Sequence, residues 1–438
     1  MHTILPETAA PLPNGRLEVG GCDATGLAQR FGTPLLVMDR MTFQSNARSY
    51  TQVLEPGRVF FATKAFCCVA LCEELDRLGL GLDVCSGGEL ATAQAAGFPA
   101  DRIVFHGNNK SSEELVHAQK AGVGRLVVDS FDEIDRIGKI SSPPNLLMRV
   151  TPGVLTDTHE YVQTGQGDSK FGFALGNGIA LSALERLLDM PHAHVMGLHS
   201  HIGSQIFDLS TFRLAAGRLA GFLGTARDHL GYKAEELNLG GGLGIAHTSD
   251  QVTPRPEAAV AAIGEAVTHE FRVRGLPEPR VSIEPGRSIA GPAGLTLYKV
   301  GTVKRVPGGR TFVSVDGGMS DNIRPALYGA RYEAFLANRM DASPRGPVTV
   351  TGKHCESGDV LIKDAFLPED IQPDDLLCVP ATGAYTYSMA SNYNRIPKPA
   401  VVMVASGDAR EIIRRENYGD MVRLDHHLDG TPVSRGIS

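Results

Sequence analysis

Lys64 has the clearest potential for covalent chemistry in this chain. It follows the apolar run "VFFAT", so we expect it to be the last residue of a buried strand. Apolar surroundings disfavour the ammonium form, and a neutral amine can attack an aldehyde to form a Schiff base. Taken alone, a lysine that extends its amine from a strand into water is the commoner case. The chemical interpretation therefore depends on which residues accompany Lys64.

Two other segments have the composition of an anion-binding site. In "NLGGGLG", Gly240, Gly241 and Gly242 follow a strand-like run, and we expect a helix after them whose first amides bind a phosphate. A plain turn explains a glycine triplet equally well. In "EPGRS", Glu284 could pair with a protonated ring nitrogen, and Arg287 could bind a phosphate or carboxylate with two hydrogen bonds. An internal ion pair between Glu284 and Arg287 is the alternative.

Two histidines in "GLHSHIGSQ" have the spacing of neighbours on one face of a strand. His199 and His201 alternate with a period of two, and such a pair could bind a metal. The sequence shows no third ligand at zinc spacing, so we expect no metal. A histidine that faces inward is more often hydrogen-bonded in a core, or stacked on a flat cofactor.

The last third of the chain holds further reactive side chains. "GKHCESGDV" brings Cys355 together with two carboxylates in a glycine-containing loop, although a buried structural cysteine is the default expectation. "DNIRPALYGA" carries Arg324 and Tyr328, and "ATGAYTYSMASNYN" carries Tyr385. Any one of these side chains could belong to an ordinary surface.

Eight short apolar runs between about residues 58 and 286 must position most of these side chains. Helical segments such as "SSEELVHAQKAG", which ends on a glycine suited to a helix C-cap, lie between most of the runs. This alternation predicts an α/β fold with a (β/α)8 TIM-like barrel. Polar residues gather at the carboxyl ends of the runs, where barrel enzymes carry their sites: Lys64, Asp83, Ser86, His106, Asp129, Arg149, His199, His201, Gly240 to Gly242 and Glu284.

From about residue 291 the pattern changes to short β-rich runs separated by proline and glycine. This pattern predicts a mostly antiparallel C-terminal β domain. The strand-like segment "TPLLVMDR" at residues 33–40 has no helix before it, so we expect it to pair with that sheet. We therefore predict a barrel over residues 40–290 and a β-rich domain made of residues 1–39 and 291–438. The two ends of the chain have the composition of polar tails.

The composition of the 438-residue chain excludes several classes of protein. A net charge of −7 without a basic stripe argues against nucleic acid and anionic membranes as partners. Seven irregularly spaced cysteines form neither a disulfide framework nor a zinc pattern, and free thiols indicate a reducing compartment. The N-terminus resembles no secretory signal, and no apolar stretch has the length of a membrane span. We therefore expect a cytoplasmic location.

Taken in order, these segments resemble the diaminopimelate decarboxylase family. Its members are fold-type III pyridoxal-phosphate enzymes, related to ornithine decarboxylase and alanine racemase, that combine a barrel with a β domain. The resemblance extends from roughly residue 30 to residue 415. It is carried by "FFATKAF", "LDVCSGGEL", "HGNNKS", "SKFGF", "GLHSHIGSQ", "LNLGGGLG", "EPGRS", "DGGMSDNIRPALYG", "GKHCESGD" and "ATGAYTYSMASNYN".

The resemblance implies a role for each matching residue. It makes Lys64 the lysine that binds pyridoxal 5'-phosphate and Cys355 the proton donor. It places the cofactor against Lys64, Asp83, His201, Ser204, Gly240, Gly241, Gly242, Glu284, Pro285, Gly286, Arg287 and Tyr385. It places the substrate, a small molecule, against Arg287, Arg324, Tyr328, Glu356 and Tyr385.

The implied reaction converts meso-2,6-diaminopimelate to L-lysine and carbon dioxide, the last step of lysine biosynthesis. A glutamate at position 284 keeps the ring nitrogen protonated and favours decarboxylation over racemisation. Arg287 and Arg324 suit the distal carboxylate of diaminopimelate, which ornithine lacks. A related decarboxylase acting on another amino acid or on a carrier-bound one is the alternative. A non-catalytic pyridoxal-phosphate binder ranks last, because the chain keeps both Lys64 and Cys355.

The resemblance also implies a homodimer with active sites shared across the interface. Cys355 and Glu356 would then enter the site of the partner subunit. By the same resemblance, we expect Lys170 and Asp359 to form an ion pair between the two subunits.

Overall fold

The computed structural model describes residues 4–154 and 169–433. The chain divides into two compact units. The barrel unit comprises Asn46–Ile245 and Thr253–Ser288, and the β unit comprises Met1–Ser45, Ala246–Val252 and Ile289–Ser438. Across the described ranges, no helix combines the length and the apolar character needed to cross a membrane.

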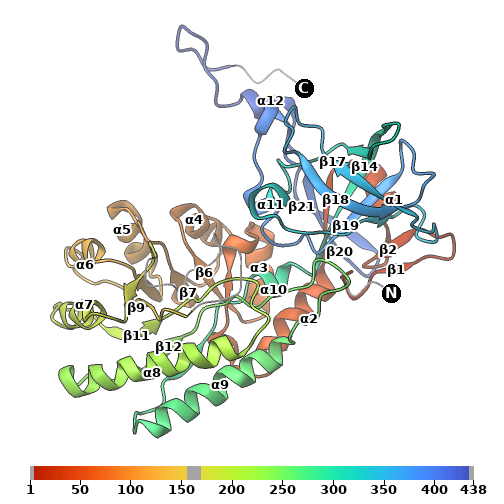
Figure 1. The fold of residues 1–438 in the computed structure, drawn as a ribbon. Helices are drawn as coiled ribbons and strands as arrows, with labels where there is room; N and C mark the ends of the chain where they lie inside the picture. The colour runs from red at the N-terminus through yellow and green to blue at the C-terminus, as the bar shows by residue number, and fades with distance from the viewer. Residues whose placement is uncertain (1–3, 155–168, 434–438) are drawn as a thin grey trace. The chain divides into compact units, whose positions relative to one another are not determined.

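Eight parallel strands form the barrel, and each one matches a predicted apolar run (Figure 1). Phe60, Val104, Val127, Leu147 and Met196, from five of these strands, pack into one buried cluster. The sheet nearly closes on itself, because the Phe60 amide donates to the Ile283 carbonyl at 2.9 Å. The predicted (β/α)8 barrel is therefore confirmed. Its strands are β5 (Phe60–Ala62), β6 (Gly81–Val84), β7 (Ile103–Phe105), β8 (Arg125–Val128), β9 (Asn145–Thr151), β11 (Val195–His199), β12 (Glu236–Asn238) and β13 (Arg280–Ser282), and the short β10 (Phe173–Ala174) pairs with β9.

Three of the helices between the strands, α4, α5 and α6, begin on a serine N-cap. In α5, Ser111 and Glu114 form a capping box, and Gly122 closes the helix in the left-handed conformation with φ 75°. The expectation of a helix directly after the glycine triplet is wrong, because a loop follows and α9 begins only at Pro256. The helices of this unit are α3 (Val69–Arg77), α4 (Gly87–Ala95), α5 (Ser112–Ala121), α6 (Phe131–Ile137), α7 (Ile179–Leu188), α8 (Ser210–Leu230) and α9 (Pro256–Val273), while α2 (Arg40–Thr51) and α10 (Arg287–Ala290) lie at its boundaries.

A second sheet organises the β unit, in the order β18-β17-β15-β14-β4-β20-β21. Its described pairings are antiparallel apart from β15 with β17 and β4 with β20. As predicted, the strand β4 (Leu35–Asp39) pairs with this sheet, between β14 and β20. The other strands are β14 (Gly294–Arg305), β15 (Thr311–Val315), β16 (Phe335–Leu336), β17 (Gly346–Thr351), β18 (Val360–Leu367), β19 (Leu376–Pro380), β20 (Ala400–Ala405) and β21 (Asp408–Ile413), and the short helices are α11 (Arg324–Tyr328) and α12 (Tyr418–Val422).

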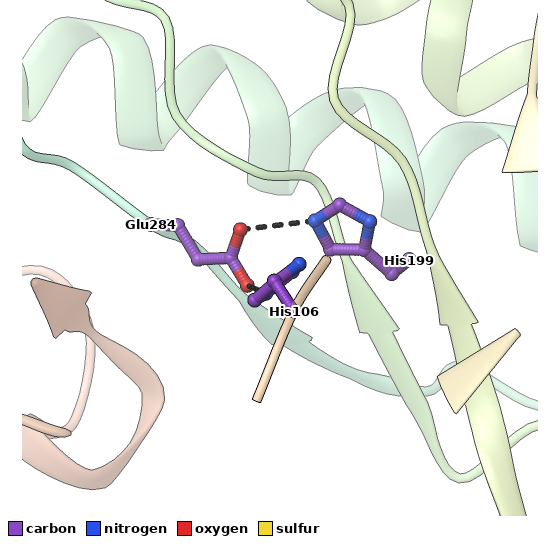
Figure 2. Close-up of side chains that lie close together, drawn as sticks. All are labelled: His106, His199 and Glu284. Atoms are coloured by element: carbon purple, nitrogen blue, oxygen red, sulfur yellow. Dashed lines mark hydrogen bonds and ion pairs between the residues drawn. The ribbon is translucent and has the colours of Figure 1, made fainter. Parts of the chain in front are cut away.

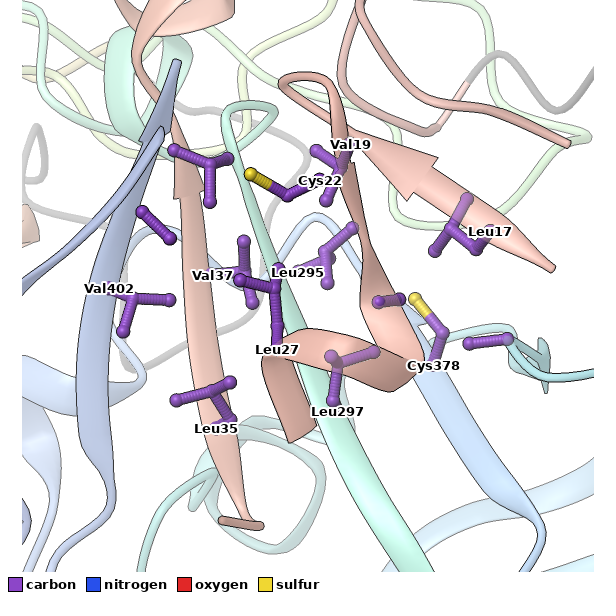
Figure 3. Packing of buried hydrophobic residues seen from close by; sticks show 14 of the residues in the cluster. Leu17, Val19, Cys22, Leu27, Leu35, Val37, Leu295, Leu297, Cys378 and Val402 are labelled. Atoms are coloured by element: carbon purple, nitrogen blue, oxygen red, sulfur yellow. The ribbon is translucent and has the colours of Figure 1, made fainter. Parts of the chain in front are cut away.

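The described N-terminal segment, from Ile4 onward, contributes to the core of the β unit and is not a polar tail. They form a small sheet of β1 (Ala10–Pro11), β2 (Leu17–Val19) and β3 (Cys22–Asp23), followed by α1 (Ala24–Phe31). Leu17 and Val19 are completely buried and belong to one apolar cluster with Leu35 and Leu295 of the large sheet (Figure 3). Burial of these side chains stabilises the unit by about 1.5–3 kcal/mol per large residue.

Candidate active site

Lys64 lies at the carboxyl end of β5, in a short 3-10 turn (Thr63–Ala65). Two details differ from prediction: the strand already ends at Ala62, and the lysine side chain is exposed. The chain turns there because the Thr63 hydroxyl donates to the Asp83 carbonyl at 2.7 Å. Burial, followed by the positive charge of Lys64, lowers the pKa of His201 well below its ordinary value. The charge of the Lys64 amine therefore influences a residue of the predicted cofactor site electrostatically.

Glu284, just beyond β13, is the centre of a buried hydrogen-bond network (Figure 2). Its Oε1 accepts from His106 Nε2 and from Asn238 Nδ2, each at 2.8 Å, and its Oε2 accepts from His199 Nε2 at 2.9 Å. Burial alone would raise the pKa of Glu284, but the two histidines outweigh it and hold that pKa well below its ordinary value. The site therefore contains a buried carboxylate that stays ionised.

The two histidines act as hydrogen-bond donors to this carboxylate. Burial lowers the pKa of His199 to about 4, so its imidazole is neutral near pH 7 and carries its proton on Nε2. The ligand atoms of His106, His199 and Glu284 lie within 4.8 Å of one another, a spacing that a metal site also shows. An Nε2 that carries a hydrogen has no lone pair for a metal. The observed geometry therefore provides hydrogen bonds to the carboxylate.

The glycine triplet lies where three strand-end loops meet. A Cβ on any of the three glycines would lie too close to a neighbouring backbone carbonyl oxygen. The distance would be 2.8 Å from Gly240 to Ser200, 2.1 Å from Gly241 to Glu284 and 2.3 Å from Gly242 to Gly203. Only glycine fits so close to neighbouring backbone. Beside the triplet, Arg287 Nη2 donates to Ser204 Oγ at 2.9 Å. A phosphate could be bound here by the backbone amides of the glycines, the Ser204 hydroxyl and the Arg287 guanidinium.

The remaining barrel residues of the predicted site lie close to this centre. Asp83 is buried in β6 with Oδ1 3.6 Å from His106 Nε2, and burial raises the pKa of Asp83 to about 6. The Pro285 carbonyl accepts from the Ala62 amide at 3.1 Å, which ties the "EPG" segment to the strand before Lys64. The barrel unit thus brings Lys64, Asp83, His201, Ser204, Gly240 to Gly242, Glu284, Pro285, Gly286 and Arg287 to the carboxyl ends of its strands.

The other five predicted site residues belong to the β unit. Cys355 and Glu356 are exposed in the loop between β17 and β18, so the default expectation of a buried structural cysteine is wrong. Arg324 begins α11 and is 5% exposed, and Tyr328 ends that helix and is partly buried. Tyr385 has a φ of 58°, a left-handed conformation that is rare for an aromatic residue. Such backbone strain is often retained at functional sites.

Asp359 is buried within its own chain. It is 3% exposed, and its Oδ1 and Oδ2 accept from the backbone amides of Met319 and His354 at 2.7 and 2.8 Å. Lys170 is exposed, with its Nζ 5.0 Å from the centroid of the Phe171 ring. The predicted ion pair between Lys170 and Asp359 is therefore wrong, because the carboxylate is buried and bound within its own chain.

Three residues that contact Glu284 were not predicted as site members. The sequence marks His106 as a polar residue at a strand end and His199 as a possible metal ligand or core histidine, while Asn238 carries no signal of its own. All three end, or directly follow, barrel strands, namely β7 and the adjacent pair β11 and β12. Their position in the sequence was the available signal, but their convergence on one carboxylate became visible only in the folded barrel.

Comparison with known proteins gives this site its class. A family model described as "Pyridoxal-dependent decarboxylase, pyridoxal binding domain" matches residues 40–291. The barrel is thus that of a pyridoxal-dependent decarboxylase.

More specific similarity covers almost the whole chain. The diaminopimelate decarboxylase of Bacillus subtilis is 50% identical over 430 residues, 96% of this chain and 98% of the relative. That of Mycobacterium tuberculosis H37Rv is 47% identical over 424 residues, 93% of this chain and 94% of the relative. The crystal structure of the M. jannaschii diaminopimelate decarboxylase with L-lysine matches with a TM-score of 0.89 at 33% identity, over 97% of this chain and 99% of the other. The chain belongs to the diaminopimelate decarboxylase family.

Proposed function

We propose that this protein decarboxylates meso-2,6-diaminopimelate to L-lysine and carbon dioxide, the last step of lysine biosynthesis, with pyridoxal 5'-phosphate as cofactor. The buried, ionised Glu284 is the observation that carries this proposal, because a carboxylate there keeps a facing ring nitrogen protonated. The relatives named diaminopimelate decarboxylase support the choice of substrate.

The residues of the barrel unit fit this cofactor. We assign Lys64 to the aldehyde, the glycine triplet with Ser204 and Arg287 to the phosphate, and Glu284 to the ring nitrogen. We assign Asp83, His201, Pro285 and Gly286 to further cofactor contacts, together with Tyr385 of the β unit. The bound cofactor supplies an electron sink for the electron pair that remains when carbon dioxide leaves. Glu284 contributes by holding a proton on the ring nitrogen, and the three N–H donors around it keep its own charge in place.

We assign proton return to the Cys355 thiol and substrate choice to charged side chains. A thiol can donate its proton as a general acid. Arg324 is buried, and its Nε has no hydrogen-bond partner among the described residues. A buried guanidinium with an unsatisfied N–H favours an anionic ligand, here the distal carboxylate of the substrate. Arg287, Tyr328 and Tyr385 would share in binding the substrate, and Glu356 suits its distal ammonium.

We further propose a homodimer in which Cys355 and Glu356 enter the site of the partner subunit. Their exposure on their own chain supports this arrangement. All seven cysteines are free, which suits a reducing cytoplasm.

The test is turnover by purified protein with pyridoxal phosphate. We expect meso-diaminopimelate to yield lysine and carbon dioxide in equal amounts, with ornithine, lysine and arginine as control substrates. Turnover of ornithine but not of diaminopimelate would overturn the substrate assignment. Borohydride treatment of the holoprotein followed by peptide mapping should label Lys64, and the Lys64→Ala variant should not be labelled.

A further inference from the structure

His354, the residue before the exposed Cys355, links three loops of the β unit. Its side chain is buried, and its Nε2 lies 2.8 Å from Ser320 Oγ and 3.3 Å from the Ser320 amide nitrogen. On the other side of the ring, Nδ1 lies 3.3 Å from Asn394 Oδ1. The ring also stacks on Tyr393, with centroids 5.5 Å apart and planes 20° apart. One imidazole thus joins the loop of Cys355 to two segments that are distant in sequence.

The donors around His354 determine which ring nitrogen carries the proton. The Ser320 amide can only donate, so Nε2 must accept and therefore has no hydrogen. The proton then lies on Nδ1, which donates to Asn394 Oδ1. A neutral His354 in this single tautomer satisfies both contacts.

Asn394 connects this network directly to the backbone of the thiol residue. Its Oδ1 also accepts from the Cys355 amide, at 3.2 Å. Asn394 has a left-handed backbone with φ 54°, and the next residue, Arg395, has φ 56°. Non-glycine residues rarely adopt this conformation, although asparagine tolerates it better than most. This backbone conformation places the side-chain oxygen Oδ1 of Asn394 within hydrogen-bond distance of His354 Nδ1 and of the Cys355 amide.

We propose that Asn394, oriented by His354, is a positioning residue for the Cys355 thiol. This inference rests on the proposed function, in which Cys355 returns the proton to the substrate. An exposed loop samples many positions, whereas proton transfer needs the donor within hydrogen-bond reach of its acceptor. The Asn394 side chain restrains the loop where it carries the thiol, so its removal lowers the rate of the step that uses the thiol. A single exposed hydrogen bond contributes only about 0.5–1.5 kcal/mol to stability, so the fold survives this change.

Two substitutions at one position separate the side chain from the backbone. Asn394→Gly keeps the left-handed conformation without strain and deletes the acceptor, whereas Asn394→Asp keeps an acceptor oxygen. We expect kcat for diaminopimelate to fall about 10-fold to 100-fold in the glycine variant, with KM and melting temperature nearly unchanged. The aspartate variant should keep kcat within about threefold of wild type. Asn392→Gly is the matched control, because Asn392 binds Ile396 and Glu416 and no atom of the Cys355 loop among the described contacts.

A second background shows whether Asn394 acts through the thiol. In Cys355→Ala protein, adding Asn394→Gly should cause no further loss of kcat, because the positioned group is already absent. An equal loss in both backgrounds, or full kcat in Asn394→Gly, would overturn the positioning role and leave the donor role of Cys355 intact. Full kcat in Cys355→Ala alone would instead remove the donor role, and the inference with it. The two failures are therefore distinguishable.

Discussion

Nε2 of His199 lies 2.9 Å from Oε2 of Glu284, and both side chains are buried at the carboxyl ends of the barrel strands. Because burial lowers the pKa of His199 to about 4, this contact joins a neutral donor to an anion near pH 7. A protonated histidine would instead neutralise the carboxylate. Hydrogen bonds thus hold the Glu284 side chain in place, and its negative charge stays available for a cationic group.

Glu284→Gln should remove this charge while keeping the size of the side chain. The amide cannot hold a proton on a ring nitrogen, so we expect kcat to fall about 10²-fold to 10³-fold. Pyridoxal phosphate should still bind, as measured by its absorbance on the protein. Glu73→Gln is the control, because Glu73 forms an ion pair with Arg77 at 3.5 Å on an exposed helix surface, away from the barrel site. A Glu284→Gln enzyme with more than half of the wild-type kcat would contradict the assignment.

Gly241→Ala should damage the proposed phosphate site. The new Cβ would lie 2.1 Å from the Glu284 carbonyl oxygen, a contact that the backbone must move to relieve. We expect a loss of about 1–3 kcal/mol in the free energy of unfolding, together with weaker binding of pyridoxal phosphate. Urea unfolding and cofactor titration measure the two effects.

Gly264→Ala is the matched control for that substitution. Gly264 lies inside α9, and a Cβ there would meet no atom within 4 Å apart from the backbone of its own helix and its chain neighbours. Alanine should therefore stabilise the helix by about 0.5–1 kcal/mol and leave cofactor binding unchanged. If both variants bound the cofactor like wild type, the glycine triplet would not be the phosphate site.

Mixing two inactive variants tests the proposal that each active site is shared between subunits. Lys64→Ala removes the lysine of one chain, and Cys355→Ala removes the thiol of the other. If each site takes its lysine and its thiol from different subunits, half of the sites in a mixed dimer are intact. Random exchange of subunits should then restore about a quarter of wild-type activity. Activity is measured after mixing and re-equilibration, and light scattering reports the dimer.

Two further results bear on that experiment. Each variant taken alone should stay nearly inactive after the same treatment. Dimers that exchange subunits but recover no activity would show that both groups come from one chain, and a monomer by light scattering would contradict the proposed dimer.

The barrel was predictable because its strands are short, buried and separated by turns. Such strands read as apolar runs, and a capped helix such as Ser112–Ala121 carries its start and stop signals in its own residues. The strand Leu17–Val19 offered no such signal, since three residues show no periodicity. Its place in the core depends on the sheet strands it packs against.

The candidate site was predictable in its residue types and only partly in its environments. The resemblance supplied Lys64 and Glu284, but the exposure of Lys64 follows from a turn that begins one residue before it. The burial of Asp359 follows from contacts with a loop some forty residues earlier, which no local pattern records. Environments of this kind arise from tertiary structure and are read from the folded chain.

Asp321 should give the β unit a stability that falls as the pH rises. Its carboxyl group is buried beside the Tyr298 hydroxyl and the Gly318 amide, and burial raises the pKa of Asp321 to about 7. Since the same group titrates near pH ~3.9 in the unfolded chain, the folded state binds the extra proton between about pH 4 and pH 7. Its contribution to stability is therefore complete below about pH 4 and is lost as the pH rises through about 7.

Asp321→Asn removes the titration, so the urea midpoint of wild type should decline relative to that of this variant between pH 5 and pH 8. Tyr298→Phe keeps the acid and removes a hydroxyl that lowers the pKa of Asp321, so its decline should persist and extend to higher pH. Parallel pH profiles for wild type and Asp321→Asn would show that Asp321 does not titrate in this range.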